Sequence, residues 1–352
     1  MRFQKNEPIG LFSSDERLSF LTELGDPLQF LAERIDFEFF RPSLVKGLYS
    51  TYDGSRGGRP PFDPVMMFKV LVLQRLYNLS DDSVEYQIND RLSFMRFLGL
   101  DFASRVPDAK TIWLFRDQLQ KKGLVKKLFD QMNAELERHD IIANAGQIVD
   151  ASFVEAPRQR NSREDNETIK AGEVPHDWKQ EPRRLCQKDT DARWTKKNGT
   201  SYFGYKNHII CDRGSKLVKD YVVTHAAVHD SQVLLELVGS EATEGQTLYA
   251  DSAYRSAEIQ DQLAERGIRS RVHYKSARNR PLTASEEKSN KARSRKRARV
   301  EHVFGFMTNS MGGMWVRACS HARNEAVIGL MNLTYNLCRV LQLNRELRGS
   351  TA

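Results

Sequence analysis

The chain has 352 residues, of which 40% are hydrophobic and 28% charged, which excludes an intrinsically disordered or collagen-like chain. Its 54 Lys and Arg residues outnumber its 46 Asp and Glu residues, and the net charge of +8 favours a polyanionic partner such as nucleic acid. Four widely spaced cysteines and the lack of a long apolar run argue against a disulfide-rich or membrane protein and favour a cytoplasmic one.

Residues 1–140 are predicted to form an all-helical domain. Three segments carry helix-start signals, with Asp63 before Pro64 in the first, Ser80 in the second and Asp108 in the third as the N-cap. Short helices with tight connections are typical of helix-turn-helix units, although a plain helical bundle gives the same pattern. We expect this domain to bind DNA and to support dimerisation.

A basic linker precedes the first of these helices. In "SRGGRPPFDP", Arg56 and Arg59 flank two glycines and stand before two prolines. Such a segment is suited to lie along a DNA groove, and it is equally suited to act as a stiff loop. Arg56 and Arg59 are therefore candidate DNA contacts.

Residues 141–352 are predicted to form a mixed α/β domain with C-terminal helices. A short strand, "IVD", ends at Asp150. A polar insertion of about 155–200 follows, which we expect to be a long or poorly ordered loop because it has few apolar residues and many charges of both signs. A hairpin over 201–226 is then indicated by two strand-like runs around "RGSK".

The pattern after the hairpin alternates between helix and strand. "HDSQVLLELV" predicts a helix, "QTLYAD" a strand ending in Asp251, "SAEIQDQLAERG" a second helix and "IRSRVHY" a last strand. A strongly basic run comes next and leads into a helix whose apolar stripe has Glu301 beside it. A further amphipathic helix closes the domain. The candidate DNA contacts in this domain are Arg255 and six residues of the basic run, namely Lys291, Arg293, Arg295, Lys296, Arg297 and Arg299.

Three acids stand out in this layout. Asp150 ends the first strand, Asp251 ends the fourth, and Glu301 lies on a later helix, which is the arrangement of the ribonuclease H fold. Carboxylates that converge repel one another and require cations, and oxygen-rich sites suit Mg²⁺ or Mn²⁺. Two such ions are able to activate an attacking oxygen and stabilise a leaving oxygen at a phosphodiester.

Five blocks of sequence, in chain order, resemble the bacterial insertion-sequence transposases of the DDE class, in the insertion sequence five group. They cover about residues 40–345. The blocks are "GGRPPFDPVMMFKVLVLQRLYNLSDDSVEYQINDRLSFMRFLGL", "IVDASFVEAPRQRNSRE", "DARWTKKNGTSYFGYKNHIICD" with "VVTHAAVHDSQ", "YADSAYRS" and "RARVEHVFG".

The resemblance implies that Asp150, Asp251 and Glu301 are catalytic and hold two Mg²⁺ ions, for which Mn²⁺ substitutes. It also implies that water cuts at the element ends and that the freed 3′-OH groups attack target DNA. Arg297 fits the Arg-x-x-x-Glu part of the family signature, whereas Ser294 and Thr308 depart from its Tyr and Lys positions. Arg297 is expected to hold a DNA phosphate or to form an ion pair with Glu301 on the same helix face.

Further candidates for supporting the site are Lys206, His208 and His229, while Tyr205 reads as an ordinary strand residue and Asp230 as a helix cap. The expected partners are double-stranded DNA, both the terminal inverted repeats and the target, and a second copy of the chain in a homodimer or higher oligomer. The expected place is the nucleoid in the bacterial cytoplasm. The alternatives are a ribonuclease H-like nuclease that only hydrolyses, and a non-enzymatic DNA-binding remnant of a transposase.

Overall fold

The computed structural model describes residues 13–50, 59–142, 144, 146–239, 245–278 and 280–349. It forms two compact units. The first extends to Gln74 and includes Leu79–Arg116, and the second contains Arg75–Asn78 and the chain from Asp117 onward. This division falls earlier than the boundary predicted at residue 140. The reason is that helix α8 (Leu124–Arg138) packs against α16 (His321–Gly349) within the second unit.

The first unit is helical, as predicted for the N-terminal region. Three helices begin at the predicted caps: an Asp63 oxygen accepts two backbone N–H groups of α4 at 2.9 Å, Ser80 caps α5, and Asp108 accepts one N–H of α7 at 2.7 Å. The helices that lie or begin in this unit are α1 (Ser13–Glu23), α2 (Pro27–Arg34), η1 (Phe37–Phe40), α3 (Arg41–Tyr49), α4 (Pro64–Leu76), α5 (Asp81–Asp90), α6 (Leu92–Leu98) and α7 (Ala109–Lys121).

The second unit is built on a mixed sheet with the strand order β2-β3-β1-β5-β6, and β4 pairs with β3. Strand β1 runs antiparallel to β3 and parallel to β5, and β5 runs parallel to β6, which is the expected ribonuclease H-like arrangement. The strands of the described residues are β1 (Gln147–Glu155), β2 (Arg193–Lys197), β3 (Thr200–Asp212), β4 (Val218–His225), β5 (Thr247–Tyr249) and β6 (Arg269–Ser270).

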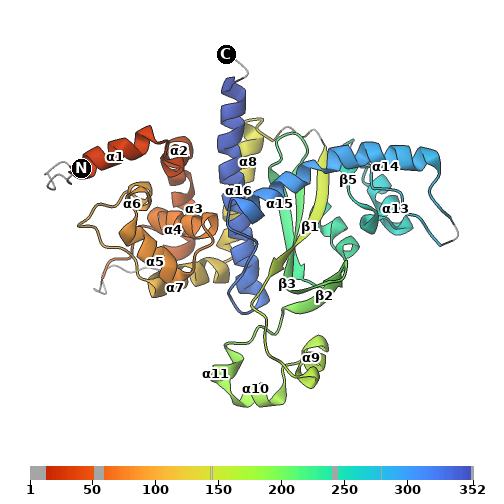
Figure 1. Ribbon diagram of the computed structural model, residues 1–352, viewed down its shortest axis with the longest axis horizontal. Helices are drawn as coiled ribbons and strands as arrows, with labels where there is room; N and C mark the ends of the chain where they lie inside the picture. Colours follow the sequence, from red (N-terminus) through yellow and green to blue (C-terminus); the bar gives the residue numbers. More distant parts are fainter. Residues whose placement is uncertain are drawn as a thin grey trace, which may run out of the picture. The chain divides into compact units, whose positions relative to one another are not determined.

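Helices cover both faces of this sheet (Figure 1). On one face, Val149, Leu234, Leu248 and Leu263 belong to a common core that includes α12 (Leu234–Val238) and α13 (Ala257–Glu265). On the other face lie α8, α16 and α15 (Arg299–Asn309). Because successive side chains of a strand point to opposite faces, Asp150 points away from the Val149 core and toward α15.

The polar insertion is ordered, which contradicts the predicted loop. It contains α9 (Arg163–Lys170), α10 (His176–Gln180) and α11 (Pro182–Leu185), which gather beyond the ends of β1 and β2 (Figure 1). Its centre is Trp178, which is 0% exposed and has the Lys188 Nζ 4.8 Å from its ring centroid. These short helices pack around one buried tryptophan and have no periodic apolar pattern. The polar composition of the segment therefore did not predict them.

The basic run forms a helix of its own, α14 (Ala284–Arg297), and Ala298 joins it to α15. Arg297 is the last residue of α14, and Glu301 lies in the first turn of α15. In the described part of the chain, no helix is both long enough and apolar enough to cross a bilayer.

Candidate active site

Asp150 is a partly buried carboxylate on β1, with 20% of its side chain exposed. Its Oδ2 accepts a hydrogen bond from the Arg297 Nη1 at 2.6 Å. Burial raises the pKa of Asp150 from 3.8 to about 6; the Arg297 charge opposes this rise, and the Asp251 charge adds to it. Burial and a like charge together therefore make the ionised form of Asp150 costly unless a cation lies nearby.

Asp251 lies two residues beyond the end of β5, where it is the N-cap of the short helix η4 (Ser252–Tyr254). Its Oδ1 accepts the Ala253 N–H at 2.7 Å. Strand β5 lies next to β1 and parallel to it, with Ile148 opposite Tyr249. Asp150 lies two residues after Ile148, and Asp251 lies two residues after Tyr249, so the two acids occupy corresponding positions. The charges of the two carboxylates interact.

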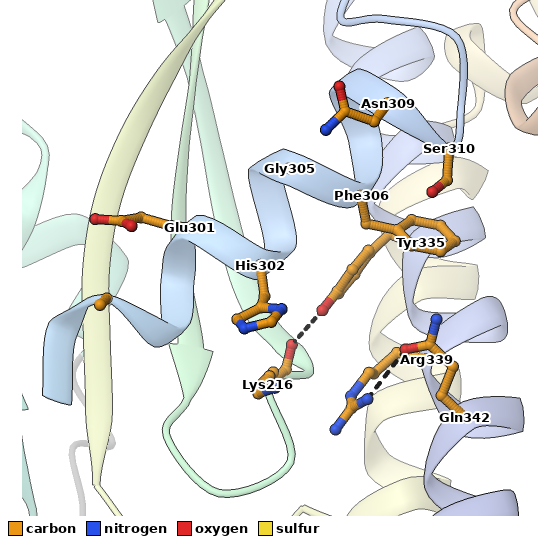
Figure 2. Close-up of a pocket in the computed structure, with 11 residues that line it drawn as sticks. Lys216, Glu301, His302, Gly305, Phe306, Asn309, Ser310, Tyr335, Arg339 and Gln342 are labelled. Atoms are coloured by element: carbon orange, nitrogen blue, oxygen red, sulfur yellow. Dashed lines mark hydrogen bonds between the residues drawn. The ribbon is translucent and has the colours of Figure 1, made fainter. Parts of the chain in front are cut away.

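Glu301 is held by a helix whose apolar residues Val300, Val303 and Met307 are buried. Its own side chain is 68% exposed. Figure 2 shows its carboxylate directed toward the side of α15 on which β1 runs, away from Tyr335 and Arg339. The third acid therefore faces the strand that bears the first one.

Arg297 links two of the three acids. Its Nη1 contacts Asp150 at 2.6 Å, and its Nη2 lies 3.9 Å from the Glu301 Oε1. Arg297 therefore forms two ion pairs, and the predicted one with Glu301 is the longer. The shorter one, with Asp150, joins residues 147 positions apart in the chain. Sequence spacing reveals an i, i+4 pair, but it does not reveal a partner on a distant strand.

The donor chemistry of these residues fits a hard divalent cation, since carboxylate oxygens are the ligands that Mg²⁺ and Mn²⁺ prefer. Asp150 and Asp251 lie near one another and repel, and the Arg297 guanidinium supplies the neutralising charge at Asp150. Within the described ranges, no three His, Cys, Asp or Glu side chains form a group that could hold a metal ion. The structure thus brings two acids together and connects the third through Arg297.

The predicted supporting residues have structural partners. The Lys206 Nζ lies 2.8 Å from the Asp230 Oδ1, so Asp230 is an ion-pair partner as well as part of a short helix. His208 is 0% exposed, and its burial lowers the pKa of the imidazole to about 4, which leaves it neutral near pH 7. His229 caps η3 (Asp230–Gln232), and Tyr205 is fully buried.

The predicted DNA contacts divide into anchored and exposed side chains. Arg255 and Arg293 both donate to the Val272 carbonyl and both lie over the Tyr274 ring, so their guanidinium groups hold the fold. Exposed side chains are those of Arg59, Lys291, Arg295, Lys296 and Arg299. Arg56 lies outside the described residues.

Lys197 was missed by the sequence interpretation. Its Nζ lies 5.7 Å from the centroid of the Phe153 ring, and its charge lowers the pKa of Asp150. It ends β2 in a hairpin whose turn residues, Asn198 and Gly199, have φ of 51° and 82°. An Asn-Gly pair between strand-like runs is a strong hairpin signal, and it could have placed Lys197 opposite Thr200 at the turn between β2 and β3.

A cavity of about 560 Å³ is lined in part by Glu301 (Figure 2). It lies between α15, α16 and the turn that joins β3 to β4. The Tyr335 hydroxyl donates to the Lys216 carbonyl at 2.9 Å, and the Arg339 Nη1 donates to the Gln342 side chain at 3.0 Å. The lining of this cavity combines the basic residues Lys216 and Arg339 with the acid Glu301 and the aromatic residues Phe306 and Tyr335.

Comparisons with known proteins give the family of the chain. Residues 144–337, more than half of the chain, match the family described as "Transposase DDE domain", and residues 16–118 match the "Transposase domain (DUF772)". A solved structure titled "Cryo-EM structure of piggyBac transposase synaptic complex with hairpin DNA" is distantly similar. It has 14% identity and a TM-score of 0.47, and the similarity covers 94% of this chain and 77% of that chain.

Proposed function

Because this chain belongs to the transposase DDE domain family, we propose that Asp150, Asp251 and Glu301 are the carboxylates with which it holds divalent cations during DNA cleavage. The family assignment makes the protein a DNA transposase, an enzyme that depends on divalent metal and acts on DNA phosphodiesters. We propose Mg²⁺ as the natural ion, with Mn²⁺ as a substitute, and two ions in each active site.

One observation supports this assignment of residues above the others. Asp150 and Asp251 follow paired positions of two adjacent parallel strands, and the charge of Asp251 raises the pKa of Asp150. A fold that needed only stability would not place two like charges together at a partly buried position, because each disfavours ionisation of the other. In a cation-binding site, the bound cation offsets the repulsion between the two carboxylates.

When bound, divalent cations supply Lewis acidity at the scissile phosphate and stabilise the leaving oxygen. The residues of the chain then have separate tasks. Asp150, within β1, and Asp251, two residues beyond β5, hold the negative charge of the site, and Arg297 balances the charge of Asp150 while the site is metal-free. We propose that Arg297 transfers from the carboxylates to a DNA phosphate when the substrate binds, since guanidinium groups pair well with both.

The proposed reaction has two steps, with no covalent protein intermediate. Water attacks the phosphodiester at each end of the element and breaks its P–O3′ bond, which frees a 3′-OH and leaves a 5′-phosphate. Each 3′-OH then attacks a phosphodiester of target DNA and displaces the 3′-oxygen of the target strand. We propose that the N-terminal helical unit reads the terminal inverted repeats through base contacts. Cutting two ends together requires at least two active sites, so we propose a homodimer or higher oligomer on DNA, within the insertion sequence five group.

Mapping the cut ends tests this proposal. Purified protein would be incubated with a labelled duplex that carries the inverted repeat flanking its gene, in Mg²⁺, Mn²⁺, Ca²⁺ or EDTA. We expect 3′-OH ends at the repeat boundary in Mg²⁺ and Mn²⁺ and none in EDTA. Cuts that are scattered along the duplex, or that form equally in EDTA, would contradict the proposed site.

Replacing Arg297 with Gln is expected to raise the pKa of Asp150 above its value of about 6, because the charge that opposes the rise is removed. Carboxyl ¹³C NMR titration of the metal-free protein measures this directly. Cleavage needs the ionised carboxylate, so the acid side of its pH profile should move to higher pH. Arg299→Gln is the matched control, because Arg299 bonds to Arg213 instead; equal titration in both variants would count against the Asp150 contact.

A further inference from the structure

A second cleft lies between α14 and the edge of the sheet, and its lining contains no acidic side chain. Its volume is about 280 Å³. The lining residues are Thr247, Tyr249, Arg269, Arg271, Ser289, Ala292, Arg293 and Lys296. We refer to these eight residues as the basic cleft. Half of them carry a positive charge.

The strand pairing directs two of these charges into the cleft. Arg269 is paired with Thr247 across β5 and β6, and paired residues of neighbouring strands share a face. Arg271 lies two residues after Arg269, so its side chain points to the same face of the sheet. Leu248, between the two lining residues of β5, belongs to the core on the opposite face. The alternation of "RSR" in the sequence therefore places both arginines on the α14 side of the sheet.

Three of these cations are exposed and lie outside any ion pair of the described residues. Among the described residues, Arg269, Arg271 and Lys296 are exposed, and none of them forms an ion pair. The Lys296 Nζ lies 5.6 Å from the centroid of the Tyr249 ring, and the Arg213 guanidinium lies 5.8 Å from the same centroid. Like charges gathered around one ring repel, and a bound anion would relieve that repulsion.

The basic cleft adjoins the candidate active site. Lys296 immediately precedes Arg297, which contacts Asp150 at 2.6 Å. From Arg213 the row of cations continues to Arg299, whose Nη1 donates to the Arg213 carbonyl at 2.8 Å, and Arg299 stands two residues before Glu301. Cations therefore extend from the edge strand to the helix turn that bears the third acid.

We propose that the basic cleft binds consecutive backbone phosphates of the DNA strand that enters the active site. This rests on the proposed function and extends it, since it assigns Arg213, Arg269 and Arg271 to the DNA path. Arginine side chains pair with phosphate oxygens in a bidentate manner, and backbone contacts position a duplex without reading its sequence. The strand would pass from Arg269 and Arg271 over Lys296 toward Asp150 and Glu301.

The test measures DNA binding without chemistry. The double variant Arg269→Ala/Arg271→Ala and the wild type would be compared in EDTA, with a labelled duplex carrying the terminal repeat, over a range of salt concentrations. Without these two arginine–phosphate pairs, the slope of log K against log salt should flatten by about 2, roughly one for each arginine. Removal of either arginine should also weaken DNA binding about tenfold.

Two further variants keep the result interpretable. Arg269→Lys/Arg271→Lys should restore most of the slope, because the charges remain. Lys127→Ala/Arg163→Ala removes two exposed cations of α8 and α9 and should leave the slope unchanged. An equal loss of slope in the Lys127→Ala/Arg163→Ala protein would overturn the proposal. So would an unchanged slope in the Arg269→Ala/Arg271→Ala protein if its plasmid capture, described next, is also unchanged.

A second arm distinguishes the two sources of the phosphates. Complexes already formed on the terminal repeat would be offered a plasmid, and its capture measured. A flatter salt slope with the repeat duplex assigns the basic cleft to the element end. Loss of plasmid capture with an unchanged salt slope assigns the basic cleft to target DNA. If neither the salt slope nor plasmid capture changes, the proposal is overturned. Because these readouts need no cleavage, a failure of the proposed catalytic function would appear separately, as intact cleft-dependent binding without cut products.

Discussion

Asp251→Asn is expected to abolish DNA cleavage and joining while leaving DNA binding intact. The change removes one negative charge at the end of β5 and keeps the shape and the acceptor oxygen that caps η4. Divalent ions contribute several kcal/mol to the transition state of phosphoryl transfer, so loss of a ligand should reduce cleavage about a thousandfold or more. Asp150→Asn should have an equal effect, since the two acids act on the same site.

Cleavage would be followed on denaturing gels, and binding by gel shift in EDTA. The matched control is Asp261→Asn, which neutralises an exposed acid on α13 and should retain wild-type cleavage. The double variant Asp150→Asn/Asp251→Asn should bind DNA at least as tightly as the wild type, because two charges that repel phosphates are gone. Loss of DNA binding in each single variant would contradict a role confined to the metals.

Asp150→Asn is also expected to stabilise the metal-free protein at neutral and alkaline pH. The folded-state pKa of about 6 exceeds the ordinary value of 3.8, so the folded protein favours the protonated carboxyl. Stability from this group is full below pH 3.8 and is lost as the pH rises through about 6. This difference between the two pKa values corresponds to a cost of about 3 kcal/mol for ionising Asp150 in the folded protein. An uncharged Asn avoids this cost and still accepts a hydrogen bond from Arg297.

Urea unfolding in EDTA at several pH values tests this expectation. The free energy of unfolding of Asp150→Asn should exceed that of the wild type by about 1–3 kcal/mol at pH 8, and the gain should vanish near pH 4. Asp261→Asn should differ from the wild type by less than about 0.5 kcal/mol at every pH. An Asp150→Asn protein no more stable than the wild type at pH 8 would mean that the carboxylate is not strained by its surroundings.

The sequence predicted much of the framework of the catalytic unit. Short apolar runs located the strands near Asp150 and Asp251, although β1 continues past Asp150 to Glu155 instead of ending there as predicted. The positions of these strands in the sheet order followed from the ribonuclease H-like arrangement. Helix caps such as Ser80 and Asp108 were readable because a cap is a local interaction within four residues. Signals of this kind require no knowledge of tertiary contacts.

Features that depend on distant contacts were not predictable in the same way. The bond between Arg297 and Asp150 joins two elements that only the folded sheet brings together. Arg293 looked like one more cation of a basic run, yet it is 7% exposed because it donates to the Val272 carbonyl. The insertion around Trp178 looked like a loop because a single buried side chain leaves no period in the sequence.

Strand transfer in vitro tests the central claim most directly. Wild-type protein would be incubated with Mg²⁺, a labelled duplex bearing the terminal repeat and a plasmid target, beside Asp251→Asn. We predict that the label becomes covalently joined to the plasmid with the wild type alone, and only when divalent metal is present. Metal-dependent cleavage without joining would contradict this account in favour of a hydrolytic nuclease, and binding without any metal-dependent chemistry would favour a non-enzymatic DNA-binding protein.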